Sequence, residues 1–296
     1  MVKPLFEGIL PAIITPFDAE GNVDFDLLRD IVRFQIDKGV HGFFVCGTVG
    51  EGPLMSIEQR KSVAEAVVRE AKGKVPVIVH VGTTNTAESV ELAKHAESIG
   101  ADAVGAVTPF FFKPDLEGLI MHYRLISEAV RVPTFVYNIP QQTGFNLTPE
   151  IFRKLCSIEN IHGIKDSSGS LSQIQEIIET APKHVTVING ADDILLAALL
   201  VGVNAEISGV ANVAPEILVE LYENFREGNY KKALELQRKT NVLRRILYEW
   251  SSIPSIKAAL ELRGIKAGMP KKPLRPLKQE EISRLKDKLK ALGLFW

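Results

Sequence analysis

The stretch IHGIKDSSG, residues 161–169, passes from an apolar, strand-like run into a polar turn, and a helix-like pattern begins at Leu171. A strand that ends in lysine and turns into a helix places an amine at the mouth of a parallel sheet. Lysine is rarely buried without a partner or a task, and desolvation lowers the pKa of a buried amine and frees it to attack a carbonyl. Lys165 is therefore a candidate Schiff-base nucleophile. A lysine that caps the strand or pairs with Asp166 is the structural alternative.

Seven similar apolar runs share the chain with this one, and amphipathic segments separate them. The apolar runs cover residues 8–16, 42–46, 75–81, 103–108, 134–139, 161–165, 185–189 and 205–210. The helical patterns that follow them cover residues 24–38, 56–72, 86–99, 116–130, 148–155, 171–180, 193–201 and 215–226. Apolar runs bounded by helices are typical of parallel strands that are buried on both faces.

Eight strand–helix units predict an α/β fold, a (β/α)8 TIM barrel with a C-terminal helical extension. A doubly wound sheet is the alternative, but no strand is followed by a G-x-G-x-x-G phosphate turn. After the eighth unit, helical patterns without preceding strands cover residues 230–250, 255–263 and 279–292. We therefore expect a barrel over residues 1–227 and a helical region over residues 228–296 that packs on it.

Composition and charge restrict the possible partners. The 296 residues carry 35 basic and 36 acidic side chains and a net charge of −1, so nucleic acid is not an expected partner. No apolar stretch approaches the ~18 residues of a membrane span, and Met1 to Pro4 leads directly into a strand-like run without a signal sequence. We expect a cytoplasmic protein. The only two cysteines, Cys46 and Cys156, form neither a disulfide framework nor a metal-binding spacing.

Two further strand ends carry residues suited to chemistry. The turn Gly47-Thr48-Val49-Gly50 could form an anion-binding nest from its backbone N–H groups, or be an ordinary turn. Tyr137 closes the fifth strand, where its phenol could shuttle protons, or be a core tyrosine with one satisfied hydroxyl. The six histidines are scattered and no G-x-S-x-G motif is present, so we expect no metal, no cofactor and no serine nucleophile.

Taken together, these motifs resemble the dihydrodipicolinate synthase/N-acetylneuraminate lyase family of pyruvate-dependent class I aldolases. The resemblance covers residues 8–276, and its motifs occur in the family's order and spacing. They are PAIITPF (11–17), GTVGEGPLMSIEQR (47–60), TPFFFKP (108–114), YNIPQQTG (137–144), GIKDSSG (163–169) and GVANVAPE (209–216). The resemblance implies a (β/α)8 barrel, a lyase that needs no cofactor, and a homotetramer.

The resemblance also implies roles for individual residues. Lys165 would form the Schiff base with pyruvate or another 2-keto acid, and Tyr137 would relay protons. Thr48 and the amide of Val49 would hold the carboxylate of pyruvate. Gly190 and the carbonyl region of Ile207 would line the site from the last strands.

Three departures from the family pattern bear on the substrate. Val49 replaces a hydroxyl residue of the family's GTTG turn, and Phe111 replaces a tyrosine that the family donates across a dimer interface. Gln142 stands where dihydrodipicolinate synthases carry an arginine that binds the carboxylate of aspartate semialdehyde, and an amide cannot give that charged contact.

Gln142 and the GEGP string at residues 50–53 favour a 2-keto-3-deoxy-sugar-acid aldolase acting on a neutral aldehyde. Dihydrodipicolinate synthase is the alternative in the same class. A keto-acid-binding barrel with weakened catalysis is the alternative outside it.

Overall fold

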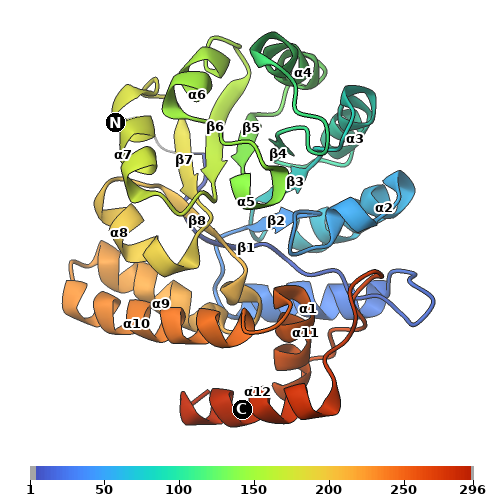
Figure 1. Ribbon diagram of the computed structural model, residues 1–296, viewed down its shortest axis with the longest axis vertical. Coiled ribbons are helices and arrows are strands. Elements are labelled where there is room, and N and C mark those ends of the chain that lie inside the picture. The colour runs from blue at the N-terminus through green and yellow to red at the C-terminus, as the bar shows by residue number, and fades with distance from the viewer. Residues whose placement is uncertain (1–4, 295–296) are drawn as a thin grey trace.

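The computed structural model describes residues 5–294, so the first four residues of the predicted barrel and the last two of the predicted helical region lie outside the description. Eight parallel strands in these residues form a barrel surrounded by helices (Figure 1), which confirms the predicted fold class. The strands are β1 (Gly8–Pro11), β2 (Phe43–Val45), β3 (Val77–His80), β4 (Ala103–Val107), β5 (Thr134–Asn138), β6 (Ile161–Asp166), β7 (Thr186–Asn189) and β8 (Ala205–Ser208).

The hydrogen-bonded strand order is β1-β8-β7-β6-β5-β4-β3-β2. The two end strands meet at a parallel bridge between Ala12 and Phe44, where the amide of Ile13 donates to the Phe44 carbonyl at 3.1 Å. In the register of β5 and β6, Tyr137 lies directly beside Lys165. The alignment of these two strands thus brings the predicted nucleophile and the predicted proton carrier together.

Two apolar clusters result from the alternation of side chains along each strand. The inner cluster fills the barrel and includes Leu10, Phe44, Ile78, Phe135 and Ile188. The outer cluster joins the alternate strand residues to the surrounding helices. Because both faces of every strand are buried, the strands read as continuous apolar runs in the sequence.

The helices of the barrel are α1 (Phe25–Asp37), α2 (Ile57–Ala71), α3 (Thr86–Ser98), α4 (Leu116–Glu128), α6 (Pro149–Leu155), α7 (Leu171–Thr180), α8 (Leu195–Leu200) and α9 (Pro215–Arg226). Helix α2 begins with a capping box, in which Ser56 and Gln59 bond each other's backbone N–H groups. A short helix that the sequence pattern did not predict, α5 (Pro140–Thr143), follows β5 and carries Gln142. Its four residues are too few to show helical periodicity.

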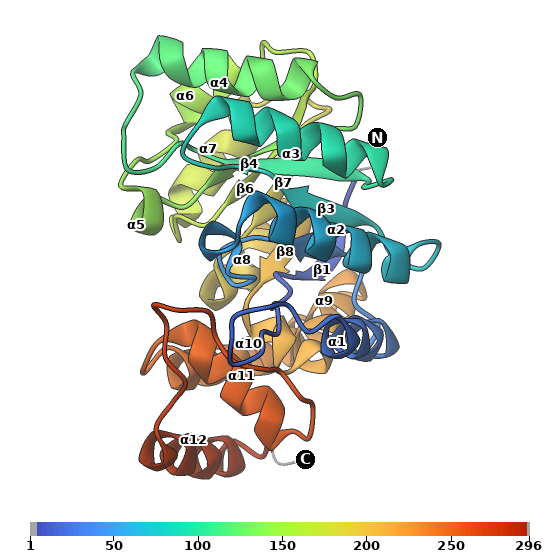
Figure 2. The ribbon, with the colours of Figure 1, turned by 90° about the vertical axis from the view of Figure 1, so that its right-hand side faces the viewer.

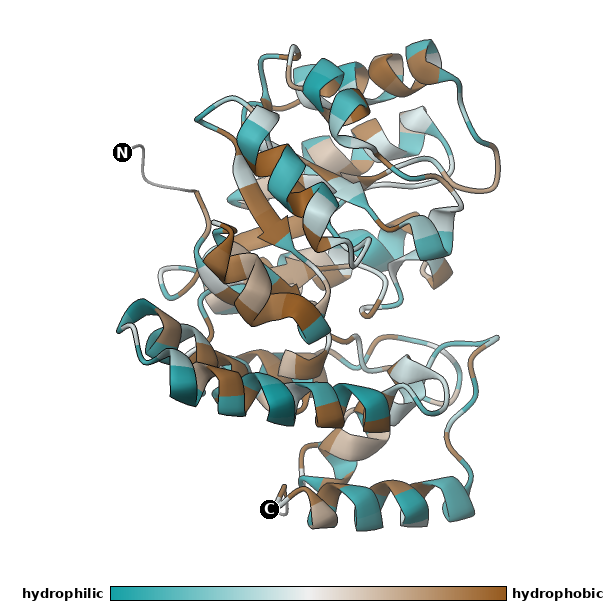
Figure 3. Cartoon of the chain, turned by 60° about the vertical axis from the view of Figure 1, so that its left-hand side comes forward, coloured by the Kyte–Doolittle hydropathy of each residue, from teal (hydrophilic) through white to brown (hydrophobic). Residues whose placement is uncertain are grey.

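The chain ends in three helices, α10 (Tyr230–Leu247), α11 (Ser252–Leu262) and α12 (Gln279–Ala291). Helix α10 runs along α9, and α12 lies farthest from the barrel (Figures 1 and 2). The alternating hydropathy bands along α10 and α12 show that these helices are amphipathic (Figure 3). Within the described part of the chain, no helix combines the length and the apolar character that crossing a membrane requires.

Candidate active site

A cavity of about 320 Å³ opens at the carboxyl end of the strands, the end at which (β/α)8 barrels carry their active sites. Every residue that the sequence analysis selected for the site lines this one cavity. They are Thr48, Val49, Tyr137, Gln142, Lys165, Gly190 and Ile207.

Lys165 is 5% exposed and lies between two aromatic faces. Its Nζ is 4.4 Å from the ring centroid of Phe44 and 4.1 Å from that of Tyr137. Among the described residues, its amine makes no hydrogen bond and no ion pair with a carboxylate. The aromatic faces can stabilise the charged amine. They donate no hydrogen bond to the lone pair of the neutral amine, so this lone pair stays available for attack.

Asp166 is not the partner of Lys165, because its carboxylate lies on the opposite face of β6. It accepts hydrogen bonds from the side chains of Asn138 at 2.9 Å and Gln173 at 2.7 Å, and from the backbone and hydroxyl of Ser168. The structural alternative in which Asp166 neutralises the lysine is therefore wrong. Asp166 instead fixes the turn that follows β6.

A hydroxyl pair extends from the lysine toward the glycine turn. The hydroxyls of Tyr137 and Thr48 lie 3.4 Å apart, at the outer limit of a hydrogen bond. The ring of Tyr137 packs edge-on against Phe44, with the centroids 5.7 Å apart. Tyr137 thus spans the space between the amine and Thr48, as a proton carrier requires.

His80 supports Tyr137 from inside the barrel, with ring centroids 5.8 Å apart. The amide of Val107 donates to its Nε2 at 3.3 Å, and its Nδ1 lies 3.1 Å from the carbonyl of Cys46. This pattern fits a neutral ring protonated on Nδ1. Burial, reinforced by the nearby Arg60 guanidinium, holds the pKa of His80 well below its usual value. The lowered pKa favours the neutral ring, and these contacts fix that ring against Tyr137.

A buried ion pair with α11 fixes the glycine turn after β2. Lys257 of α11 lies 2.6 Å from the carboxylate of Glu51, and its Nζ also donates to the carbonyls of Thr15 and Met269, at 2.7 Å each. The hydroxyl of Thr15 in turn donates to the Gly50 carbonyl at 2.8 Å. The acidic residue of the GEGP string therefore anchors the turn and does not face the substrate cavity.

Gly190 has to lack a side chain because the Lys165 stem passes directly over it. A Cβ at this position would lie 2.8 Å from Cε of Lys165 and would overlap the Ser167 hydroxyl oxygen. The glycine after β7 therefore leaves the space in which the lysine side chain lies.

Two buried carboxyl groups lie near the ends of β7 and β8, where Asp192 lines the cavity and Glu206 does not. The Ser208 hydroxyl donates to Asp192, and the Asn189 amide donates to Glu206. Burial raises the pKa of Asp192, and burial together with Asp192 raises the pKa of Glu206 well above its usual value. Burial and the neighbouring Asp192 thus disfavour the charged form of Glu206 next to the cavity.

The sequence analysis missed the contribution of the C-terminal helices to the site. Arg244 and Tyr248 at the end of α10 line the cavity, as do Ser252 and Ile253 at the start of α11. No local signal marks these residues, because an arginine and a tyrosine in an amphipathic helix are typical of a solvated face. Only the docking of α10 on the barrel brings them to the strand ends.

Phe111 does not line this cavity. It is 84% exposed, its neighbour Phe112 is 77% exposed, and the two ring centroids lie 5.0 Å apart. Phe111 also has a φ of 75°, an uncommon conformation for a large side chain. A strained, exposed aromatic pair is typical of a surface that receives another chain.

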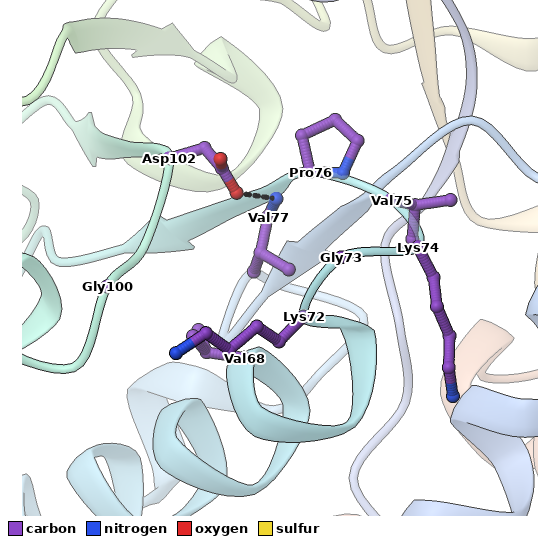
Figure 4. A pocket seen from close by; sticks show the side chains of 9 residues that line it. All are labelled: Val68, Lys72, Gly73, Lys74, Val75, Pro76, Val77, Gly100 and Asp102. Carbon is purple, nitrogen blue, oxygen red and sulfur yellow. Dashed lines mark hydrogen bonds between the residues drawn. The ribbon is translucent and has the colours of Figure 1, made fainter.

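A second cavity, of about 440 Å³, lies at the opposite end of the barrel, next to the beginnings of β3 and β4 (Figure 4). Its lysines, Lys72 and Lys74, point in different directions, and Asp102 accepts a hydrogen bond from the Val77 amide at 2.8 Å. No reactive groups converge there. Among residues 5–294, no cluster of three or more His, Cys, Asp or Glu side chains is arranged to hold a metal ion.

Comparison with known proteins gives a consistent result. The model of the dihydrodipicolinate synthetase family matches residues 5–292. The chain is 39% identical to a 4-hydroxy-tetrahydrodipicolinate synthase of Archaeoglobus fulgidus, over 98% of this chain and 100% of the relative. It is 40% identical to the protein of the same name in Methanopyrus kandleri, over 98% of this chain and 97% of the relative.

Solved structures agree with these relatives. The structure of YagE from Escherichia coli, a protein of the dihydrodipicolinic acid synthase family in complex with pyruvate, superposes with a TM-score of 0.95. The two chains are 32% identical, and the match covers 98% of this chain and 99% of the other. The names of the relatives favour the dihydrodipicolinate synthase alternative over the sugar-acid interpretation that Gln142 suggested.

Proposed function

Because the chain belongs to the dihydrodipicolinate synthetase family, whose members are pyruvate-dependent class I aldolases, we propose that it joins pyruvate to a carboxylate-bearing aldehyde, as a 4-hydroxy-tetrahydrodipicolinate synthase does. The names of the relatives support the choice of aldehyde. The observation that carries the chemistry is the amine of Lys165, which is buried beside Tyr137 without a hydrogen bond or an ion pair among residues 5–294.

In this proposal, the neutral amine of Lys165 attacks the ketone carbon of pyruvate, and loss of water gives an imine. The imine withdraws electrons from C3, so that removal of a C3 proton gives an enamine. The enamine carbon then attacks the aldehyde carbonyl and forms the new carbon–carbon bond. Tyr137 moves protons between these groups, and the aldehyde oxygen takes up a proton when the bond forms.

The carboxylate of pyruvate is held at the glycine turn. The Thr48 hydroxyl and the backbone amide of Val49 are the donors, and the Thr48 hydroxyl already lies 3.4 Å from that of Tyr137. Binding the carboxylate here directs the ketone toward Lys165. Gly190 and Ile207 complete the wall and leave space for the lysine stem.

A 2-keto-3-deoxy-sugar-acid aldolase is the second candidate function, and Gln142 is the observation that favours it. The Gln142 side chain lines the cavity from α5. Its amide can bond the hydroxyls of a neutral aldehyde, whereas it offers no charge to a carboxylate.

A homotetramer in the cytoplasm remains part of the proposal. The exposed Phe111 and Phe112 support an interface at the loop after β4. A measured mass in solution tests this part, since a monomer would contradict it.

Borohydride trapping tests the mechanism. Incubation with pyruvate and borohydride should add one reduced pyruvate to the chain, and peptide mapping should place it on Lys165. Lys257 is an internal control, because it is a buried lysine whose amine is occupied by a carboxylate and two carbonyls. An unmodified, folded protein, or an adduct on another lysine, would contradict the mechanism. Rates with aspartate semialdehyde and glyceraldehyde then distinguish the two candidate functions.

A further inference from the structure

The cavity offers a cation for an acidic substrate at a place that the sequence motifs do not mark. We propose that Arg244, held against Tyr248 on α10, binds the carboxylate of the aldehyde substrate and thereby replaces the charge that Gln142 lacks. This inference rests on the proposed function, because it names the group that the second substrate presents.

Arg244 has the exposure that a binding residue needs, and its guanidinium makes an ion pair with Asp193 at 3.4 Å. Its side chain is 31% exposed, and it lines the same cavity as Lys165. Within the described part of the chain, its guanidinium donates no hydrogen bond. Arginine can therefore offer two parallel N–H groups to a carboxylate, which is its most favourable contact with this group.

Tyr248 holds the guanidinium in position. The Cζ of Arg244 lies 4.8 Å from the centre of the Tyr248 ring, a cation–π contact. The Tyr248 hydroxyl reaches the floor of the cavity, since a Cβ added to Gly209 would lie 3.4 Å from it and 3.5 Å from Cγ2 of Val49. The Arg244–Tyr248 pair thus extends from the rim of the cavity to the glycine turn. The aldehyde has to lie between the rim and this turn.

Two acidic residues near Arg244 oppose the binding of an anion. Asp193 forms an ion pair with Arg244 at 3.4 Å, and its side chain is 43% exposed. A half-exposed ion pair of this kind contributes little to stability. A substrate carboxylate can therefore displace Asp193, or bind the guanidinium beside it, at small cost in free energy. The buried Asp192 accepts a hydrogen bond from the Ser208 hydroxyl. Burial raises the pKa of Asp192, while the Ser208 hydrogen bond and the nearby Arg244 oppose that change.

Gln142 and Arg244 reach the same cavity from different elements, α5 and α10. A charge supplied from α10 would allow a protein with glutamine on α5 to accept an acidic aldehyde. This arrangement reconciles the names of the relatives with the glutamine. It also predicts that an arginine on α5 can restore function when the one on α10 is lost.

Steady-state kinetics with aspartate semialdehyde and with the neutral glyceraldehyde test the inference. Arg244→Gln should raise the KM for aspartate semialdehyde by about 10- to 100-fold, the range for losing a charge-assisted hydrogen bond. The KM for pyruvate, the rate of borohydride trapping and the KM for glyceraldehyde should stay at wild-type values. The KM of Arg244→Lys for aspartate semialdehyde should lie between those of wild type and Arg244→Gln, since lysine keeps the charge but not the paired donors.

Arg245→Gln is the matched control, because Arg245 is the exposed neighbour on the same helix and does not line the cavity. It should behave as wild type. Gln142→Arg, added to Arg244→Gln, should recover part of the lost affinity for aspartate semialdehyde.

The possible outcomes separate this inference from the proposed function. No pyruvate adduct in the wild-type protein would refute the proposed function itself. A normal pyruvate adduct would leave the proposed function standing. If Arg244→Gln then changed the KM for both aldehydes equally, or changed neither KM, only the role of Arg244 would be overturned. If wild type used neither aldehyde, or if Arg244→Gln affected glyceraldehyde 3-phosphate alone, the carboxylate assignment would be wrong.

Discussion

Two buried lysines in this molecule have opposite surroundings. Lys165 at the barrel mouth contacts the faces of Phe44 and Tyr137 and has no carboxylate or carbonyl partner among residues 5–294. Lys257 in α11 is 2% exposed and is surrounded by Glu51 and by the carbonyls of Thr15 and Met269. Burial alone therefore does not identify a candidate nucleophile; the partners of the amine distinguish Lys165, the proposed nucleophile, from Lys257, which anchors a turn.

The difference also explains how the two regions work together. Burial lowers the pKa of Lys257, while the Glu51 carboxylate opposes that change. The pair joins α11 to the turn that carries Thr48, and Thr48 lies next to Tyr137. Lys257 thus positions the turn that is proposed to hold the pyruvate beside Lys165.

The largest expected effect is that of Lys165→Met on activity. The variant should show no detectable aldol activity and no pyruvate adduct, since the nucleophile is absent. Its free energy of unfolding should stay within about 1 kcal/mol of wild type, because methionine keeps the apolar stem and no buried partner is left uncompensated.

Urea unfolding and the aldolase assay on the same preparation measure both quantities. A large loss of stability would show that Lys165 has a structural partner, and the contrast with Lys257 would disappear. Retained activity would remove Lys165 from the mechanism.

The next effect is that of Lys257→Met on stability. Removing the amine leaves the Glu51 carboxylate buried without its cation, so we expect a loss of about 3–5 kcal/mol in the free energy of unfolding. The double variant Glu51→Gln/Lys257→Met should lose less than Lys257→Met alone, since it removes the uncompensated charge. Urea unfolding of wild type, both single variants and the double variant measures the coupling. Additive losses would mean that the two residues act independently.

The sequence predicted the barrel because each strand is a local apolar run, and it predicted Lys165 because that run ends in lysine. It also placed Thr48, Tyr137, Gln142, Gly190 and Ile207, all of which line one cavity. These residues lie at or just after the carboxyl ends of strands, and the barrel brings all of its strand ends to one face. Local patterns were sufficient for Lys165, Thr48 and Tyr137, whereas Gln142, Gly190 and Ile207 were placed by the resemblance to the family.

The roles of Lys257 and Arg244 were not predictable in the same way. Lys257 lies in the predicted helix 255–263, where a lysine usually faces solvent, and Arg244 lies in the predicted helix 230–250. Their positions depend on how α10 and α11 dock against the barrel, which is a contact between segments far apart in the sequence. Helical periodicity predicts which face of a helix is apolar, but not which part of the fold it covers.

Val49→Thr should give the smallest effect and should affect only the Lys165 region. Threonine has nearly the shape of valine and restores a second hydroxyl beside Thr48, so the KM for pyruvate should fall by about 2- to 10-fold, corresponding to ~0.5–1.5 kcal/mol for one hydrogen bond. Stability should change little, because Val49 is only partly buried. Pyruvate kinetics and urea unfolding measure the two effects.

An unchanged KM for pyruvate would indicate that another donor already takes the place of the missing hydroxyl. The Tyr248 hydroxyl is the group positioned for this, since it approaches Gly209 from the same side as the Val49 side chain. Tyr248→Phe, made both in wild type and in the Val49→Thr background, distinguishes the possibilities. If the two hydroxyls replace one another, removing the Tyr248 hydroxyl should raise the KM for pyruvate in wild type and have little effect in the Val49→Thr background.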